Sequence, residues 1–259
     1  NPNIAWEKVT KKNLGIDFSF FNKMFSGSVD FFNDYRTNII MNGRDRAVPS
    51  YFGFAPPVVN AGIVEVNGYE IDFRYSQTLF EQFRLWANFS LTHSVDKVIF
   101  KDDPGLLPEY RQKAGFPNRQ SYSLVDKGFY NSWDEVYGST AFENNDSKIP
   151  GNYRILDYNG DGIINGPGDT VPFDYPSNPQ NTYNATIGLD WKGFSAMVQF
   201  YGVSNVSRFI STESFGKAHF NSVYEEGTYW SKDDQNANSP MPKLNSSLYG
   251  STGTRYLYD

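Results

Sequence analysis

The fold is decided by the stretch NTYNATIGLDW (181–191), KG (192–193) and FSAMVQFYGV (194–203). Apolar residues occupy every second position from Tyr183 to Trp191 and again from Phe194 to Phe200, which is the period of a β-strand with one apolar face. Lys192-Gly193 is a two-residue turn of the kind that closes tight hairpins. Each arm has about ten residues, close to the ~9–11 that a tilted strand needs to cross a bilayer. The stretch therefore predicts a transmembrane β-hairpin.

Two further hairpins follow from the same alternation, so that the three are expected at about residues 9–40, 63–93 and 181–203. Their tight turns are expected at Asn22-Lys23, near Ser76 to Leu79, and at Lys192-Gly193. Irregular segments rich in Gly, Pro, Asn and Asp separate them, at about 41–62, 94–180 and 204–255, with a short helix expected near Leu106 to Gly115. Short turns that alternate with long loops are typical of outer-membrane barrels, whose short turns are periplasmic and whose long loops are extracellular.

Charged residues lie on the strand faces opposite the apolar ones. They are Asp17, Asp30, Glu70, Asp72, Arg74, Arg84 and Asp190. A wet lumen accommodates such groups, whereas a closed apolar core would require a partner for each. We expect an all-β fold, an antiparallel transmembrane β-barrel segment of about six strands that cannot close a barrel alone. Aromatic girdles at the lipid interfaces would account for Tyr69, Tyr75, Tyr183 and Trp191.

Composition excludes several classes of function. The 259 residues include no cysteine, which rules out disulfides, thiolate metal sites and a cysteine nucleophile. The net charge of −6 and the lack of a Lys/Arg stripe argue against nucleic acid as a partner. No apolar run of ~18 residues occurs, so a transmembrane helix is not expected. Catalytic motifs are also missing, and we expect neither catalytic residues nor an organic cofactor.

One loop has the chemistry of a calcium site. DYNGDGI (157–163) places oxygen ligands at positions 1, 3 and 5, a glycine at 6 and a backbone carbonyl at 7, as in an EF-hand loop. Position 12 is Gly168, and the acid comes one residue later. The expected ligands are Asp157, Asn159, Asp161, the carbonyl of Ile163 and Asp169. The alternative is an Asx-rich turn in which the carboxylates cap backbone amides.

Other polar and aromatic groups have simpler interpretations. His93 and His219 lack metal-type spacing and are expected at solvent or at an interface, and the acid pairs Glu225-Glu226 and Asp233-Asp234 are expected to be solvated. Loop aromatics either stack on sugars, pack against a partner protein or form a loop core. They are Tyr130, Trp133, Tyr137, Tyr229 and Trp230. The sequence does not identify a substrate-binding residue.

Several motifs, in order along the chain, resemble those of the SusC/RagA family of TonB-dependent outer-membrane transporters. They are WEKVT (6–10), NLGIDF (13–18), SGSVDFF (26–32), NGYE (67–70), DYNGDG (157–162) and KGF (192–194). The resemblance runs from Trp6 to about Gly202. It implies a part of the C-terminal half of a plugged barrel of ~22 strands. The plug and the TonB-contacting segment are expected elsewhere in a longer chain.

The resemblance further implies a function and partners. It points to a nutrient importer of a Bacteroidetes-type Gram-negative outer membrane, which takes up oligosaccharides or oligopeptides together with a SusD-like surface lipoprotein. Energy would come from the TonB complex through the N-terminal part of the protein. The alternatives are a soluble all-β carbohydrate-binding module with a structural calcium ion, and a glycoside hydrolase. The module would leave a large apolar face exposed, and for the hydrolase the sequence nominates no carboxylate pair.

Overall fold

The computed structural model describes residues 4–43, 46, 51, 53, 56–143, 148–208, 230, 232, 233 and 235. The chain divides into two compact units, Asn1–Gln120 with Tyr175–Val206, and Ser121–Asp174 with Ser207–Tyr258. In the described part of the chain, no helix is long and apolar enough to cross a membrane.

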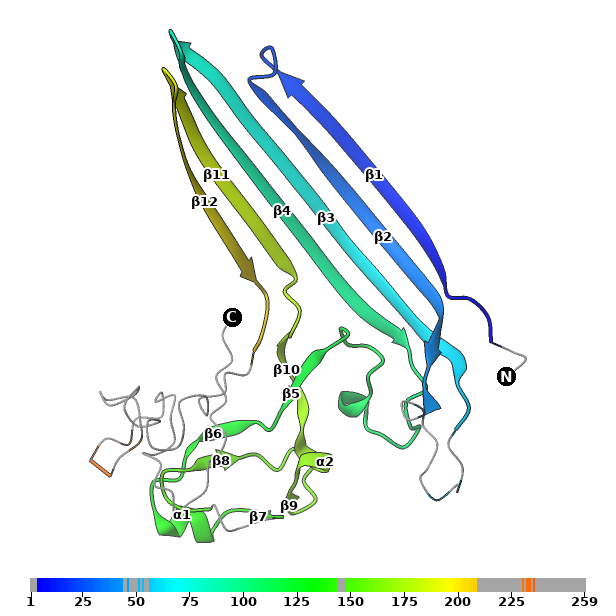
Figure 1. Ribbon diagram of the computed structural model, residues 1–259. Coiled ribbons are helices and arrows are strands. Elements are labelled where there is room, and N and C mark those ends of the chain that lie inside the picture. The colour runs from blue at the N-terminus through cyan, green and yellow to red at the C-terminus, as the bar shows by residue number, and fades with distance from the viewer. Residues whose placement is uncertain are drawn as a thin grey trace. The chain divides into compact units, whose positions relative to one another are not determined.

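The first unit is a six-stranded antiparallel sheet with the order β1-β2-β3-β4-β11-β12, drawn as one layer of long strands in Figure 1. Its strands are β1 (Lys8–Phe20), β2 (Phe25–Met41), β3 (Val59–Phe80), β4 (Phe83–Phe100), β11 (Asn181–Trp191) and β12 (Phe194–Ser204). Strands that are adjacent in sequence pair as hairpins, and β11 pairs with β4 across the long insertion. The three predicted hairpins are confirmed, and the middle one is longer than expected.

The register places apolar side chains of all six strands on one side of the sheet. Leu14 lies opposite Phe31, Phe31 opposite Tyr69, and Ile71 opposite Leu91. We call this side the apolar face. Its residues are Leu14, Ile16, Phe18 and Phe20 in β1; Phe25, Val29 and Phe31 in β2; Tyr69, Ile71, Phe73 and Tyr75 in β3; Phe83, Leu85, Ala87, Phe89 and Leu91 in β4; Tyr183, Ala185, Ile187, Leu189 and Trp191 in β11; and Phe194, Ala196, Val198 and Phe200 in β12.

Aromatic rings gather at both ends of the apolar face. Near the tight turns, Phe25 contacts Phe73 and Tyr75, with ring centroids 5.9 and 5.1 Å apart. Toward the long connections, Phe31, Tyr69 and His93 form a row in which the Tyr69 and His93 rings stack at 5.0 Å. The apolar face therefore carries a cluster of aromatic rings at each end.

One predicted turn is wrong. The sequence pattern predicts the middle turn near Ser76 to Leu79, but β3 continues to Phe80 and the turn is Glu81-Gln82. The polar residues 76–78 keep the strand alternation, because Ser76 and Thr78 lie opposite Trp86 and Arg84 in β4. The stacked rings of Phe80 and Phe83, 4.9 Å apart, then close the hairpin. The polar composition of residues 76–78 therefore does not indicate a turn, because these residues belong to the strand.

Aromatic rings cover glycines on neighbouring strands. On the polar side of the sheet, the Trp86 ring lies where a Cβ on Gly188 would be. We expect Gly188→Val to force this ring away and to destabilise the folded protein by about 1–3 kcal/mol. Urea unfolding of the full-length protein in lipid vesicles checks the value. Thr186→Val, on the same side of β11, is the matched control, and equal effects of the two substitutions would contradict the prediction.

The second unit is built from short elements within the long insertion. The insertion as a whole contains η3 (Glu109–Arg111), β5 (Gln120–Ser123), β6 (Asp126–Phe129), α1 (Trp133–Tyr137), β7 (Ala141–Phe142), β8 (Tyr153–Ile155), β9 (Ile163–Ile164), α2 (Gly166–Asp169) and β10 (Val171–Pro176). The pairs are β5 with β10, β6 with β8, and β7 with β9. The predicted short helix near Leu106 to Gly115 is only the three-residue 3₁₀ turn η3.

Candidate functional site

The side of the sheet opposite the apolar face carries the charged residues, as the alternation predicted; we call it the polar face. Asp30 and Glu70 lie directly opposite each other on β2 and β3. Asp30 occupies the space next to Gly15, where a Cβ would collide with its carboxylate. Arg84 forms an ion pair with Asp190, with Nη2 and Oδ2 2.8 Å apart, and the Ser195 hydroxyl donates to the other oxygen of Asp190. The polar face is therefore a hydrogen-bonding wall with excess negative charge.

A shallow hollow lies in the middle of this wall. It has a volume of about 390 Å³ and is lined mainly by polar side chains. Those side chains are Asp72, Arg74, Asn88, Ser90, Asn184 and Thr186. Both charge signs and several amide and hydroxyl groups are present, so the hollow can bind polar groups by hydrogen bonds.

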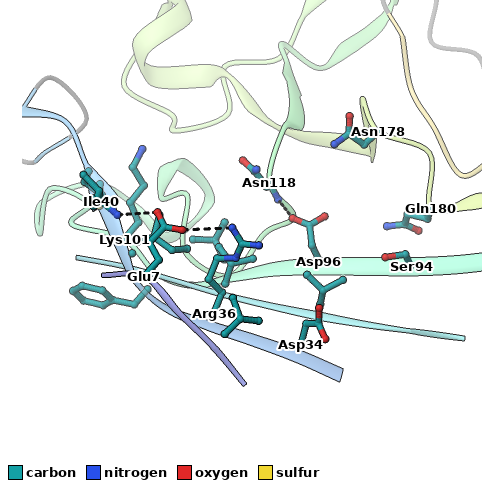
Figure 2. Close-up of a pocket in the computed structure, with 18 of the residues that line it drawn as sticks. Glu7, Asp34, Arg36, Ile40, Ser94, Asp96, Lys101, Asn118, Asn178 and Gln180 are labelled. Carbon is teal, nitrogen blue, oxygen red and sulfur yellow. Dashed lines mark hydrogen bonds and ion pairs between the residues drawn. The ribbon is translucent and has the colours of Figure 1, made fainter. Parts of the chain in front are cut away.

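A larger cavity of about 710 Å³ lies on the polar face, at the end of the sheet that carries the long connections (Figure 2). Val64, Val66 and Val98 contribute apolar floor to it. Charged groups surround this floor: the Glu7 carboxylate lies 3.5 Å from the Arg36 guanidinium. The cavity thus combines an apolar floor with a charged wall, a combination suited to a flexible, polar organic ligand.

The insertion supplies the remaining wall of the cavity. Beyond His93, the edge of β4 no longer pairs with β11, and the chain at 115–116 takes over its hydrogen bonds: Val98 N donates to Phe116 O at 2.9 Å, and Gly115 N donates to Val98 O at 2.8 Å. Asn118 N then donates to the Asp96 carboxylate at 2.7 Å. Asn178 and Gln180 complete this wall.

This cavity has no counterpart among the sequence predictions. The composition of residues 94–180 predicts one irregular segment, although the alternation continues through Ser94, Asp96 and Val98 to the end of β4. This continued alternation could have predicted that the strand extends to the cavity. The approach of residues 115–118 to β4 depends on long-range backbone pairing, and no local pattern indicates it.

The predicted calcium loop has its oxygen atoms turned toward its own backbone. Both oxygens of Asp157 accept loop amides, from Gly160 at 2.8 Å and Gly162 at 2.9 Å. Asp161 Oδ1 accepts the amide of Ile163 at 2.8 Å, and Asn159 Oδ1 accepts that of Asp161 at 2.9 Å. These are the contacts of an Asx-rich turn. Across the described residues, no group of three or more His, Cys, Asp or Glu side chains is arranged to hold a metal ion.

Asp169 is fully buried beneath this loop. Its Oδ1 accepts the amides of Tyr158 at 2.7 Å and Asn159 at 3.3 Å, and its Oδ2 accepts that of Asn165 at 2.8 Å. One carboxylate therefore holds the first half of the loop to the N-terminus of α2. This contact arises because Asn165 caps α2 and brings residue 169 back against residues 158–159.

The loop aromatics divide into buried and exposed pairs. Tyr130 and Trp230 are buried, and the Trp230 indole donates to the Asn131 side chain at 2.8 Å, so these two belong to a loop core. Trp133 and Tyr137 on α1 are exposed and stack on each other at 5.9 Å. Tyr153 lies in the second unit with these aromatics. Burial of its hydroxyl raises the pKa of Tyr153 to about 12.

The remaining sequence predictions are partly within the described residues. His93 stacks on Tyr69, and its Nδ1 lies 2.5 Å from the Asn181 side-chain oxygen. Tyr229, His219, Asp234 and the pair Glu225-Glu226 lie outside the described residues.

Comparison with known proteins gives consistent matches. Residues 1–243 match the family model described as TonB dependent receptor-like, beta-barrel. TonB-dependent receptor P3 of Formosa agariphila is 24% identical over 273 residues, covering 100% of this chain and 26% of the receptor. TonB-dependent receptor SusC of Bacteroides thetaiotaomicron is 26% identical over 181 residues, covering 68% of this chain and 17% of SusC.

Solved structures share the fold. The RagAB peptide transporter superimposes with a TM-score of 0.66 at 19% identity, covering 95% of this chain and 27% of the transporter chain. The RagAB peptide importer in its open-open state gives a TM-score of 0.65. The chain thus spans about a quarter, or less, of the length of these relatives.

Proposed function

This chain belongs to the TonB-dependent receptor-like β-barrel family, and on that premise we propose that it forms part of the wall of an outer-membrane nutrient importer. The observation that carries the proposal is the apolar face, which runs without a charged residue across six strands. In water such a face would have to be covered, whereas in a bilayer it lies against lipid and the polar face lines the lumen. The long connections are then extracellular.

The cargo in this proposal is an oligosaccharide or an oligopeptide. The polar face and the larger cavity offer charged, amide and apolar groups, which suit either ligand. The names of the RagAB structures, a peptide transporter and importer, support peptides. The proposed partners are a SusD-like surface lipoprotein and the TonB complex, which would be contacted through parts of the protein outside this chain.

The test uses the full-length parent protein. We expect it to fractionate with the outer membrane, to require detergent for extraction, and to co-purify with a lipoprotein. Its intact mass under denaturing conditions should be several times the 29.5 kDa of this chain. Uptake of labelled oligopeptides and oligosaccharides by cells with and without the gene then identifies the cargo. Recovery of a soluble, detergent-independent monomer would overturn the proposal.

We further propose that the 157–169 loop binds calcium. The side chains of Asp157, Asn159 and Asp161 and the carbonyl of Ile163 would be ligands, and Asp169 would close the site. Gly160 and Gly162 have positive φ values of 71° and 89°, which permit the tight turns of the loop. Carboxylate oxygens keep acceptor capacity beyond the amide bonds that they accept, so the donor set fits a hard cation. Bound calcium would supply structural stability here.

Calorimetric titration of chelator-treated full-length protein with calcium chloride tests the site. We expect binding with a dissociation constant of about 10⁻⁴–10⁻³ M, as in extracellular calcium modules. Asp157→Asn with Asp161→Asn should abolish the binding heat, because charge attracts the cation. Asp126→Asn, an exposed acid that also accepts a backbone amide, is the control. Absence of binding in the native protein would leave the loop an Asx-rich turn.

A further inference from the structure

The apolar face continues into a polar rim at the end of the sheet that carries the long connections. Immediately beyond the row of Phe31, Tyr69 and His93, the same side of the sheet bears Lys12, Asn33 and Asn67, which lie opposite one another in register. The next positions add Glu65 and Lys97, and Lys8 follows on β1. We call these six residues the polar rim.

The polar rim is predominantly basic. Lys8, Lys12 and Lys97 are exposed, and no ion pair among the residues that the structure describes includes any of them. The one carboxylate, that of Glu65, accepts a hydrogen bond from Asn33 Nδ2 at 2.7 Å. Three ammonium groups thus face outward with a single acid among them.

The opposite side of the same strand shows a different arrangement. Lys11 points to the polar face, where its ammonium lies 3.3 Å from the Asp34 carboxylate. At this end of the sheet, the polar face also carries the acids Glu7, Asp34 and Asp96. Positive charge is therefore concentrated on the outward side, at the boundary of the apolar band, and is not a general property of this end of the sheet.

We propose that the polar rim binds the phosphate groups of anionic lipid headgroups in the leaflet next to the long connections. This inference rests on the proposed membrane location. The aromatic row marks the depth of the interface, and lysines just above it can keep their ammonium groups among headgroups while their stems cover apolar surface. Each lysine near an anionic surface favours binding about fivefold. Asn33 Nδ2 donates to Glu65 and to Asn67 Oδ1, each at 2.7 Å, so the amide nitrogen of Asn67 is the donor that the pair adds at the same depth.

The test measures which lipids lie next to the polar rim. A fluorophore is attached at Thr10→Cys, an exposed outward position between Lys8 and Lys12, in full-length protein without other cysteines. The protein is reconstituted in phosphatidylcholine vesicles that contain a trace of phosphatidic acid or phosphatidylcholine with a nitroxide near the top of one acyl chain. We expect at least about fivefold enrichment of phosphatidic acid over phosphatidylcholine from the quenching, the effect of one lysine.

The variants and competitors decide the outcome. Combined K8Q, K12Q and K97Q should bring the enrichment close to one, whereas K11Q, on the opposite face, should leave it unchanged. Equal quenching by both lipids in the native protein, or an equal loss with K11Q, overturns the proposal. Loss of enrichment on adding inorganic phosphate at constant ionic strength would indicate a site for the free ion and also overturn it. If neither lipid quenched the fluorophore, the proposed membrane location would be wrong, and the lipid-binding role of the polar rim would be wrong with it.

Discussion

Ile187→Lys is expected to destabilise the folded protein in a membrane and to reduce its assembly. Ile187 lies in the middle of β11 on the apolar face, between Ala87 of β4 and Val198 of β12. A lysine at the midplane of a barrel's lipid face costs about 2–4 kcal/mol, which is a large part of the stability of a typical domain. Urea unfolding of the full-length protein in lipid vesicles, and the folded fraction recovered from outer membranes, measure the effect.

The adjacent residue provides the control. Thr186 lies on the polar face, where the shallow hollow already contains Arg74, so Thr186→Lys should be tolerated with a change well below 1 kcal/mol. The two substitutions add the same group one residue apart, and only the face differs. If both reduced assembly equally, or if Ile187→Lys had no effect, the assignment of the apolar face to lipid would be wrong.

Asp169→Ala is expected to open the 157–169 segment of the second unit. The carboxylate is fully buried and accepts three backbone amides. Its removal leaves those donors without a partner and should cost on the order of 4 kcal/mol of local stability. Limited proteolysis with mass spectrometry should show new cleavage within residues 157–169. Hydrogen exchange should show loss of protection at the amides of Tyr158 and Asn165.

Two further variants separate this role from a general effect of lost charge. Asp169→Asn keeps one acceptor oxygen and should give an intermediate loss of protection. Asp126→Ala removes an exposed carboxylate that accepts one amide, from Gly128 at 3.2 Å, and should leave proteolysis of the loop unchanged. Unaltered cleavage in Asp169→Ala would show that α2 and the loop are held by other contacts.

The exposed aromatic pair on α1 illustrates how far composition can guide function. Sequence reasoning grouped Trp133 and Tyr137 with Tyr130 and Trp230 as loop aromatics with one set of possible roles. The structure separates them, because Tyr130 is 1% exposed and Tyr137 is 80% exposed. Aromatic residues in loops carry no periodic signal that distinguishes burial from exposure, so only the packed unit could divide them.

The hairpins and the two faces of the sheet follow from local sequence patterns. Alternation is a local property, because successive side chains of a strand point to opposite sides, and the two-residue turn at Lys192-Gly193 sets the register of its hairpin. Charge on one parity and apolar residues on the other were therefore enough to assign Asp190 to the polar face and Ile187 to the apolar face. The family motifs then placed these hairpins in a TonB-dependent receptor barrel.

Other features depend on contacts between distant parts of the chain, and no local pattern predicts them. The turn at Glu81-Gln82 was decided by the pairing of β3 with β4 along its whole length, and the cavity wall by the pairing of residues 115–116 with Val98. Asp169 is fully buried, and its oxygens accept three backbone amides, contacts that the spacing of the loop residues did not indicate. A carboxylate binds whichever donors the folded chain brings to it, and residue type and spacing along the sequence do not specify that choice.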